Sequence, residues 1–434
     1  MDKMADVLGR AGAWCGQNKY LSAIKNAFQN FMPLTIAGAI GVLWCNVLVN
    51  DQTGLGLFFK PIMALDFLNP AFQAVNFCTI SCITVGITLG IAQEIGVWNM
   101  GAEKAGYIPG LVGLAAWLSV TNTSHMVDGA KEAFTGVAGN ELGATGLFTG
   151  MIIGVLSVEL FCFFEKQDAL KIKMPEQVPP GVARAFEVLV PATITLIITA
   201  CIGSACYNLT GLYLNDVIKN GIQGPLGAVG ATIPGVMIIY LVIMLFWLVG
   251  IHGNNMLSAV KEALFTPLAL ENVEAFNKGE TPKNIINMYF LQMCGEFGGS
   301  GVTIGLVIAI MIFGKREDNK AIATLSLVPG LFNINETVTF GIPMVLNPIL
   351  GIPFVVAPLI TIIIGYVLTV IGFCPVACLT VPWTTPPIVF GFLACGANVM
   401  GAVTQAILIV VSTVIYVPFL ISYEKYQNKQ AAEV

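Results

Sequence analysis

The chain has 434 residues, of which 56% are hydrophobic and only 10% are charged, and its mean hydropathy is +0.81. A soluble domain carries about a quarter of its residues as charged side chains, so this composition excludes an ordinary soluble protein and predicts a polytopic membrane protein in a lipid bilayer. The net charge of −5 provides no basic surface, which argues against nucleic acid as a partner.

The eleven cysteines indicate neither a metal site nor a disulfide framework. Most lie in apolar runs such as AVNFCTISCITVG and GFCPVACLT, where a free thiol behaves as a small hydrophobe. Each of these runs places two cysteines four residues apart, but no histidine or second cysteine pair accompanies them. We therefore expect no metal and no cofactor.

Apolar windows of about 20 residues predict the membrane-spanning helices. Before the first window, Leu21, Ile24, Phe28 and Met32 recur at helical spacing after Lys19, which predicts an amphipathic helix on the cytoplasmic face. Several windows are short or broken by Gly and Pro, so the sequence predicts an all-α protein with roughly eight to ten crossings, about ten helices. The windows are residues 32–49, 75–95, 105–120, 146–164, 188–206, 233–251, a cluster within 285–313, 349–373, 388–397 and 403–421.

Lysine and arginine predict the orientation. The N-terminal segment and residues 165–184, 315–320 and 423–430 are rich in basic side chains and are predicted to be cytoplasmic, whereas residues 121–143 have one lysine against several acids and fit the outside. Both termini would then be cytoplasmic in a multi-pass protein of the plasma (inner) membrane, which requires an even number of crossings.

Residues 251 and 315 are both predicted to be cytoplasmic, so the chain between them must cross the membrane an even number of times. One apolar window alone would give a single crossing, so we expect either two passes or a re-entrant hairpin. The polar segment 260–284 in this region is predicted to be non-helical backbone that lines a protein-enclosed, watery cavity. Broken helices and polar clusters accumulate downstream of the Pro-rich loop KIKMPEQVPPG. We therefore expect a scaffold domain in residues 1–215 and a functional domain in residues 216–434.

Four polar segments interrupt the downstream apolar sequence, and the first, FWLVGIHGNNM, holds one of only two histidines. Gly250 and Gly253 flank His252, so backbone can approach a ligand closely there, and Asn254 and Asn255 add hydrogen-bond donors and acceptors. We predict that Gly253 and Asn254 bind substrate. The alternative is a helix end at which His252 is satisfied by a carbonyl at the interface.

The second segment, CGEFGGSGVTIG, contains Glu296, Ser300 and closely spaced glycines. It lacks the GKS/T of a phosphate-binding loop. Close helix packing through small residues accounts for most of its glycines, while some of its backbone could face a cavity.

The third segment, FNINETVTF, places Asn335 and the carboxylate of Glu336 in an apolar region. An ionised carboxylate at the bilayer centre costs about 2.5–3.5 kcal/mol, so Glu336 is expected to avoid lipid. It could be protonated, pair with His252 or bind a ligand hydroxyl. A helix N-terminus with Asn335 as its cap is compatible with a binding role, and we predict that Asn335 binds substrate. The Ile342-Pro343 and Asn347-Pro348 pairs favour a re-entrant tip.

The fourth segment is LTVPWTTPPIVFG, in which three prolines forbid regular helix. Trp383 and Thr384 offer an aromatic face beside a hydroxyl, which suits a sugar ring. The alternative is a tryptophan in the aromatic belt at the membrane–water interface.

Together these segments offer amides, hydroxyls, one imidazole and one aromatic ring without a cluster of cations, which favours a neutral polyhydroxylated ligand. Metal-spaced histidine pairs, GxSxG and Walker motifs are missing. The pattern indicates transport more than chemistry on this chain alone.

GIHGNN, GGSGVTIGL, LFNINETVTFGIPMVLNP and VPWTTPP, with NAFQNFMPLTIAGAI near the N-terminus, resemble the membrane component EIIC of the bacterial sugar phosphotransferase system, in its lactose/cellobiose/diacetylchitobiose branch. The resemblance implies a homodimer formed through the N-terminal spans and a C-terminal substrate domain with two re-entrant hairpins. It implies a β-linked disaccharide of the cellobiose or diacetylchitobiose type, carried inward and phosphorylated at its 6-hydroxyl. The phosphoryl donor would be a phosphocysteine on a separate cytoplasmic EIIB protein, supplied by EIIA, so whether this chain is itself an enzyme stays open.

In this family's pattern Glu336 matches the NINE glutamate, which hydrogen-bonds the 6-hydroxyl and can act as its base. His252 orients the same region, and Trp383 and Thr384 line the sugar site. The alternative function is a proton-coupled secondary disaccharide transporter in which Glu336 carries the proton. A membrane transferase acting on lipid would need a basic phosphate site, which the sequence lacks.

Overall fold

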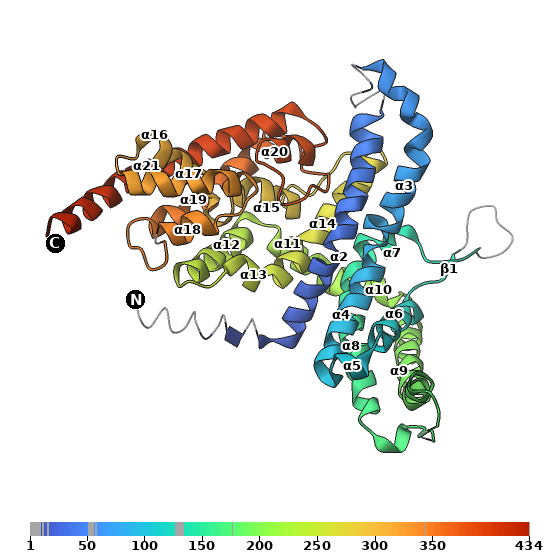
Figure 1. The fold of residues 1–434 in the computed structure, drawn as a ribbon. Helices are drawn as coiled ribbons and strands as arrows, with labels where there is room; N and C mark the ends of the chain where they lie inside the picture. The colour runs from blue at the N-terminus through green and yellow to red at the C-terminus, as the bar shows by residue number, and fades with distance from the viewer. Residues whose placement is uncertain are drawn as a thin grey trace. The chain divides into compact units, whose positions relative to one another are not determined.

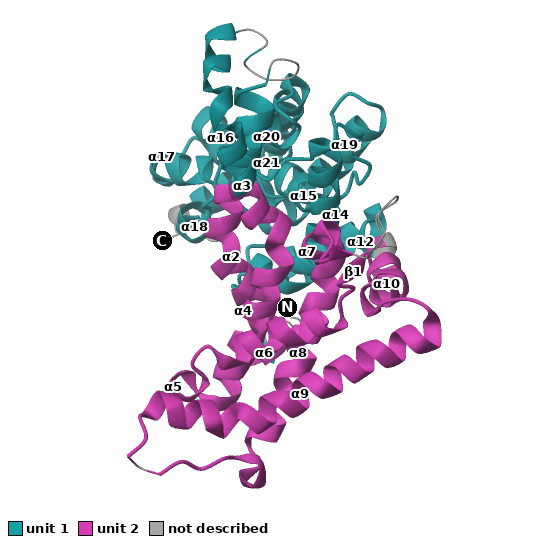
Figure 2. Cartoon of the chain, turned by 90° about the vertical axis from the view of Figure 1, so that its right-hand side faces the viewer, with its two compact units in different colours: residues 1–16, 39–74, 229–434 teal, residues 17–38, 75–228 magenta. Residues whose placement is uncertain are grey.

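The structure is a computed structural model that describes residues 17–50, 59–125, 134–175, 177–342 and 344–433, together with positions 10, 13, 14 and 56. Figure 1 shows the helices along the chain. The chain forms two compact units, coloured in Figure 2. Unit 1 contains residues 1–16, 39–74 and 229–434, and unit 2 contains residues 17–38 and 75–228.

Unit 2 is a helical bundle in which α4, α6 and α8 pack on one another and α9 packs on α6 and α8. Small residues permit this close packing: a Cβ on Gly150 of α8 would collide with the Thr88 hydroxyl of α4. The elements with residues in this unit are α2 (Lys19–Leu43), α3 (Asn69–Cys78), η4 (Ile80–Cys82), α4 (Ile83–Met100), α5 (Ala102–Ala105), α6 (Ile108–Val120), β1 (Ser124–His125), β2 (Phe134–Thr135), α7 (Gly139–Leu142), α8 (Ala144–Glu165), η5 (Asp168–Leu170), α9 (Pro180–Thr210), α10 (Leu214–Ile218), η6 (Lys219–Gln223) and α11 (Gly224–Gly230).

The loop predicted to lie outside contains a short antiparallel hairpin, the one pair of strands in the described part of the chain. β1 pairs with β2 in the register Ser124 to Thr135 and His125 to Phe134. Residues 126–133 of this loop lie outside the described residues.

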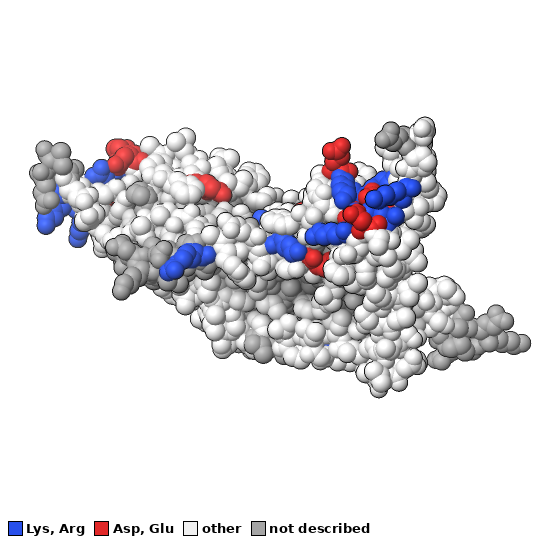
Figure 3. All heavy atoms as spheres, turned by 90° about the horizontal axis from the view of Figure 1, so that it is seen from below, with Lys and Arg blue, Asp and Glu red and all other residues white. Residues whose placement is uncertain are grey.

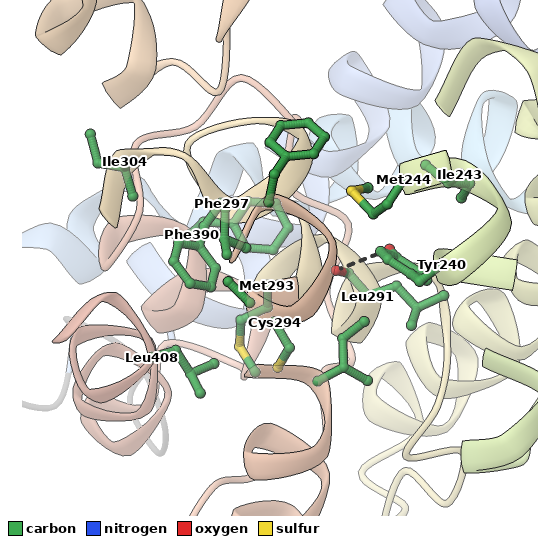
Figure 4. Packing of buried hydrophobic residues seen from close by; sticks show 14 of the residues in the cluster. Tyr240, Ile243, Met244, Leu291, Met293, Cys294, Phe297, Ile304, Phe390 and Leu408 are labelled. Carbon is green, nitrogen blue, oxygen red and sulfur yellow. Dashed lines mark hydrogen bonds between the residues drawn. The ribbon is translucent and has the colours of Figure 1, made fainter. Parts of the chain in front are cut away.

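Unit 1 holds the polar segments of the downstream sequence. Its core is apolar: in Figure 4, Tyr240 and Met244 of α12 pack near Leu291 and Phe297, and the Tyr240 hydroxyl lies 3.5 Å from the Leu291 carbonyl oxygen. Residues of α2, α3 and α11 also belong to this unit, and its other elements are η1 (Trp44–Leu48), η3 (Lys60–Leu68), α12 (Ile233–Leu248), α13 (Gly253–Met256), α14 (Ser258–Asn277), α15 (Met288–Gly295), η7 (Ser300–Val302), α16 (Ile304–Phe313), α17 (Glu317–Leu331), α18 (Glu336–Gly341), α19 (Gly351–Val370), α20 (Val389–Ala394) and α21 (Val399–Glu433).

The prediction of an all-α polytopic membrane protein is confirmed. In the described ranges, six helical stretches are long and apolar enough to cross a bilayer, and the bent pair formed by Met288–Val302 and Ile304–Phe313 is a seventh candidate. Two shorter apolar helices, α6 and α12, add to these. On the face shown in Figure 3, charged side chains gather in a few groups and most of the visible surface is uncharged. The six stretches are Lys19–Leu48, Lys60–Met100, Ala144–Glu165, Pro180–Thr210, Gly351–Val370 and Val399–Gln430.

The predicted helix after Lys19 is present: α2 begins at Lys19 and continues past Pro33 into the first apolar window. One local prediction was wrong, because the polar segment 260–284 is mostly helix and α14 runs through residue 277. Its polar side chains find partners inside the protein: Asn272 donates to the carbonyls of Asn284 and Ala377 at 2.8 and 3.0 Å.

Regular helix is interrupted at two other places, in the glycine-rich second segment and in the proline-rich fourth segment. The chain bends by 59° between Met288–Val302 and Ile304–Phe313. Gly298, Gly299 and Gly301, which lie between α15 and α16, have φ of +69°, +88° and +77°. Side chains other than glycine rarely adopt this conformation, so the glycines permit the turn. In the fourth segment, residues 379–388 contain no regular helix, as their prolines predicted, and α20 begins at Val389.

Candidate functional site

The structure brings His252 and Glu336 together, although 84 positions of sequence separate them. His252 precedes α13, and Glu336 is the first residue of α18. The His252 Nε2 and the Glu336 Oε1 are 3.9 Å apart, with side chains 37% and 49% exposed. The imidazole and carboxylate therefore face the same accessible space, at a distance too long for a direct hydrogen bond.

The position of His252 follows from its local sequence. Its ring lies 4.4 Å from the ring of Trp247 at the end of α12, and its Nδ1 accepts a hydrogen bond from the Asn255 N–H at 3.3 Å. Because Nδ1 accepts, the neutral imidazole carries its proton on Nε2, the atom that faces Glu336. Burial lowers the pKa of His252 below its ordinary value, against the opposing influence of the Glu336 carboxylate, so the neutral form prevails.

Asn335 occupies the N-cap position of α18, as predicted, but its side chain does not cap the helix. It is buried, and its Nδ2 donates to the Ser300 carbonyl oxygen at 2.7 Å. The prediction of a side-chain cap was therefore wrong, and the Asn335 amide instead binds the buried Ser300 carbonyl at the α15–α16 break. Asn335 holds the start of α18 against that break.

Asn333, for which no role was predicted, connects three segments. It has φ of +63°, its Oδ1 accepts from the Gly298 N–H at 2.6 Å, and its Nδ2 donates to the carbonyls of Trp383 and Thr385. An asparagine tolerates this left-handed backbone better than most residues. The one signal in the sequence is the pair of amides beside Glu336, since the partners lie 35 to 52 positions away.

Of the two predicted residues in this segment, Trp383 contacts Asn333 through its backbone carbonyl, and Thr384 lies between the two carbonyls that Asn333 binds. Trp383 is exposed and Thr384 is partly buried. Within the described ranges, no hydrogen bond joins either side chain to His252 or Glu336. Their predicted contact with a sugar stays a prediction.

Gly253 and Asn254 complete the set of predicted residues. A Cβ on Gly253 would collide with the carbonyl oxygen of Ile243, so this glycine allows α13 to pack against α12. The Asn254 Nδ2 donates to the Ser300 Oγ at 2.9 Å, and its Oδ1 accepts from Lys261 Nζ at 3.3 Å. Both predicted asparagines, Asn254 and Asn335, thus bind Ser300.

Sequence reasoning missed Lys261, and assigned Glu296 only to a glycine-rich break. Lys261 of α14 is ion-paired with Glu296, which also accepts a hydrogen bond from the Tyr240 hydroxyl at 2.7 Å. The signal for Lys261 was present, since it is a lone cation in the run NMLSAVKEALF. No cluster of three or more His, Cys, Asp and Glu side chains suited to a metal occurs among the described residues.

Comparison with known proteins gives the family. The model of the phosphotransferase system EIIC family matches residues 25–358. An oligo-beta-mannoside-specific EIIC component of Bacillus subtilis is 33% identical, over 98% of this chain and 94% of its own length. A cellobiose-specific EIIC component of Lactococcus lactis is 30% identical, over 98% of each chain.

The fold agrees with these relatives. The crystal structure of the transporter ChbC, the IIC component from the N,N'-diacetylchitobiose-specific phosphotransferase system, matches with a TM-score of 0.88 at 30% identity, over 97% of each chain. The resemblance found in GIHGNN, NINE and VPWTTPP is therefore confirmed over nearly the whole sequence. The chain belongs to the EIIC family of the phosphotransferase system, in its lactose/cellobiose branch.

Proposed function

We propose that this EIIC protein binds a β-linked disaccharide, carries it inward across the plasma membrane and presents its 6-hydroxyl to a phosphocysteine on EIIB. The named relatives support the sugar class, since β-mannosides, cellobiose and N,N'-diacetylchitobiose share β-linked six-membered sugars. The predicted site residues include no lysine or arginine, which agrees with a neutral ligand. EIIB receives its phosphoryl group from EIIA, and the protein works as a homodimer with both termini in the cytoplasm.

One observation carries this proposal: the 3.9 Å gap between His252 Nε2 and Glu336 Oε1. A hydroxyl oxygen about 2.8 Å from each atom would bridge them with an angle near 90° at the oxygen, so a single hydroxyl group fits the gap. The Nε2–H would donate to the hydroxyl oxygen, and the hydroxyl would donate its proton to the carboxylate. The two groups thus bind one hydroxyl in opposite senses.

The same arrangement suits phosphoryl transfer. The hydroxyl oxygen attacks the phosphorus of the phosphocysteine, the new O–P bond forms as the P–S bond breaks, and the cysteine leaves as a thiolate while Glu336 takes the proton. A sugar hydroxyl is a poor nucleophile, and a positioned general base contributes about 10²–10⁴-fold to such a step. Trp383 and Thr384 would contact the sugar ring.

The test is a transport assay in sealed membrane vesicles that contain the full-length protein. Purified EIIB, EIIA and their phosphoryl donors are added on the cytoplasmic side, and radiolabelled cellobiose, diacetylchitobiose, lactose and an α-linked control disaccharide are added on the other side. We expect a β-linked disaccharide to appear inside as its phosphate. Accumulation of unmodified sugar that an uncoupler abolishes would instead identify a proton-coupled transporter.

A further inference from the structure

A buried ion pair lies next to the site and has no role in the proposed chemistry. Lys261 and Glu296 are in contact, with side chains only 7% and 18% exposed. Lys261 comes from the first turn of α14, and Glu296 directly follows α15 at the break before α16. The Tyr240 hydroxyl donates to the same Glu296 oxygen that Lys261 contacts.

Stability alone is a poor explanation for this pair. Desolvating two charges can cost as much as their attraction returns, and apolar residues of similar volume are often as stable or more so. The ion pair is therefore better explained by a role in positioning neighbouring side chains.

The contacts of Lys261 indicate that role. Its Nζ donates to Asn254 Oδ1 at 3.3 Å. Because this oxygen is engaged, the amide turns its Nδ2 to the Ser300 Oγ, at 2.9 Å. Ser300 in turn accepts the Asn335 amide at its carbonyl oxygen, at 2.7 Å.

This chain of contacts ends next to both groups that face the 3.9 Å gap. Asn254 is two residues from His252, and Asn335 directly precedes Glu336. The contacts of the ion pair itself are with Asn254 and Tyr240. The pair therefore acts on the segments that carry the imidazole and the carboxylate.

We propose that Lys261 and Glu296 are positioning residues of the sugar site: their ion pair orients the amide of Asn254 and, through Ser300, fixes the segment of Asn335 and Glu336 in the arrangement that receives the sugar hydroxyl. This inference rests on the proposed function. The ion pair supplies a donor in a fixed place, which a neutral apolar pair of the same size does not.

The test compares Lys261→Met, Glu296→Gln and the double variant K261M/E296Q in the purified full-length protein. Each single variant leaves one buried charge without its partner and should lower the Tm. The double variant removes both charges and should return the Tm close to that of the wild type. In the double variant the Asn254 amide still lacks the lysine donor. The affinity of this variant for the β-linked disaccharide should therefore be about 10-fold weaker, which is the effect of losing one hydrogen bond to a charged group.

Ser300→Ala gives a second measurement without any change of charge. It removes the oxygen that accepts from Asn254, so it should weaken the affinity for the disaccharide several-fold. If the double variant does not fold, this measurement tests the positioning role by itself. The matched control is Lys278→Met, just after α14, which breaks the exposed ion pair with Glu274 and should change neither the Tm nor the affinity.

Wild-type sugar affinity in both K261M/E296Q and S300A would show that the pair serves stability alone and would overturn the inference. Affinity is measured by calorimetric titration with the disaccharide, and the Tm by intrinsic fluorescence of the same samples. A wild-type protein that neither binds nor phosphorylates any β-linked disaccharide would refute the proposed function instead. The two failures are therefore distinguishable in one series.

Discussion

Replacing Gly299 with Ala tests whether the α15–α16 break positions the segment of Glu336. Gly299 has φ of +88° and ψ of −173°, a backbone region that is almost exclusive to glycine and costs other residues about 1–3 kcal/mol. A Cβ there would lie 2.6 Å from Asn335 Cγ and 2.7 Å from Asn335 Cβ. These distances are too short for any real contact, so the Asn335 side chain must move.

The expected magnitude is the sum of two effects. Backbone strain lowers the free energy of unfolding by about 1–3 kcal/mol, and overpacking adds about 1–3 kcal/mol. Moving Asn335 also breaks its hydrogen bond to the Ser300 carbonyl. We therefore expect a lower Tm together with a sugar affinity at least several-fold weaker.

Gly279→Ala is the matched control, because Gly279 has φ of +73° and a Cβ added to it would meet no atom within 4 Å. It should cost about 1–2 kcal/mol of stability through strain and leave sugar binding unchanged. Both variants are assayed by thermal unfolding in detergent and by disaccharide titration at low temperature on the folded protein. Equal Tm values and equal affinities for G299A and G279A would refute the reasoning.

Glu336→Gln should slow phosphoryl transfer about 10²–10⁴-fold with little change in Tm, since its side chain is half exposed; a large loss of Tm in thermal unfolding would make it structural. His252→Ala should weaken sugar binding about 10-fold in a titration, and unchanged affinity would remove it from the site. Asn333→Ala should lower the Tm and the sugar affinity together, because three hydrogen bonds are lost; an unchanged Tm contradicts this. Burial raises the pKa of the Glu141 carboxyl, with Asn215 acting in the opposite direction. The folded protein therefore favours the protonated carboxyl, and the stability gained from this is lost as the pH rises through the raised pKa. Glu141→Gln should therefore raise the Tm at pH 7–8 and lose this advantage near pH 4, and a pH-independent difference in unfolding scans would contradict the assignment.

Glu336 and His252 could be identified from the sequence because a carboxylate or an imidazole is conspicuous in an apolar chain. The structure places them 3.9 Å apart. The prolines in 379–387 likewise predict the observed loss of helix. Such signals are local, since they depend on the chemistry of one residue and its immediate neighbours.

The contacts that hold these groups could not be predicted in the same way. Asn335 was expected to cap its own helix, and it binds a carbonyl 35 positions earlier. Segment 260–284 was expected to be irregular because it is polar, yet α14 satisfies its polar side chains with partners such as Glu296 and Ala377. Whether a polar residue caps a helix, faces water or pairs inside the protein depends on distant residues that no local pattern specifies.

The candidate site thus combines accessible polar side chains with polar side chains that are hydrogen-bonded inside the protein. Glu336 and His252 are accessible and hold each other only loosely, which leaves room for a hydroxyl between them. The amides of Asn335 and Asn333 are bonded to backbone at the α15–α16 break. A break in a membrane helix exposes carbonyl and N–H groups that need partners, and here those partners come from the segment that carries the carboxylate. The same irregularity that would be costly in lipid therefore fixes the segment that carries Glu336, the proposed base. This accounts for the presence of the broken helix and the NINE sequence in one chain.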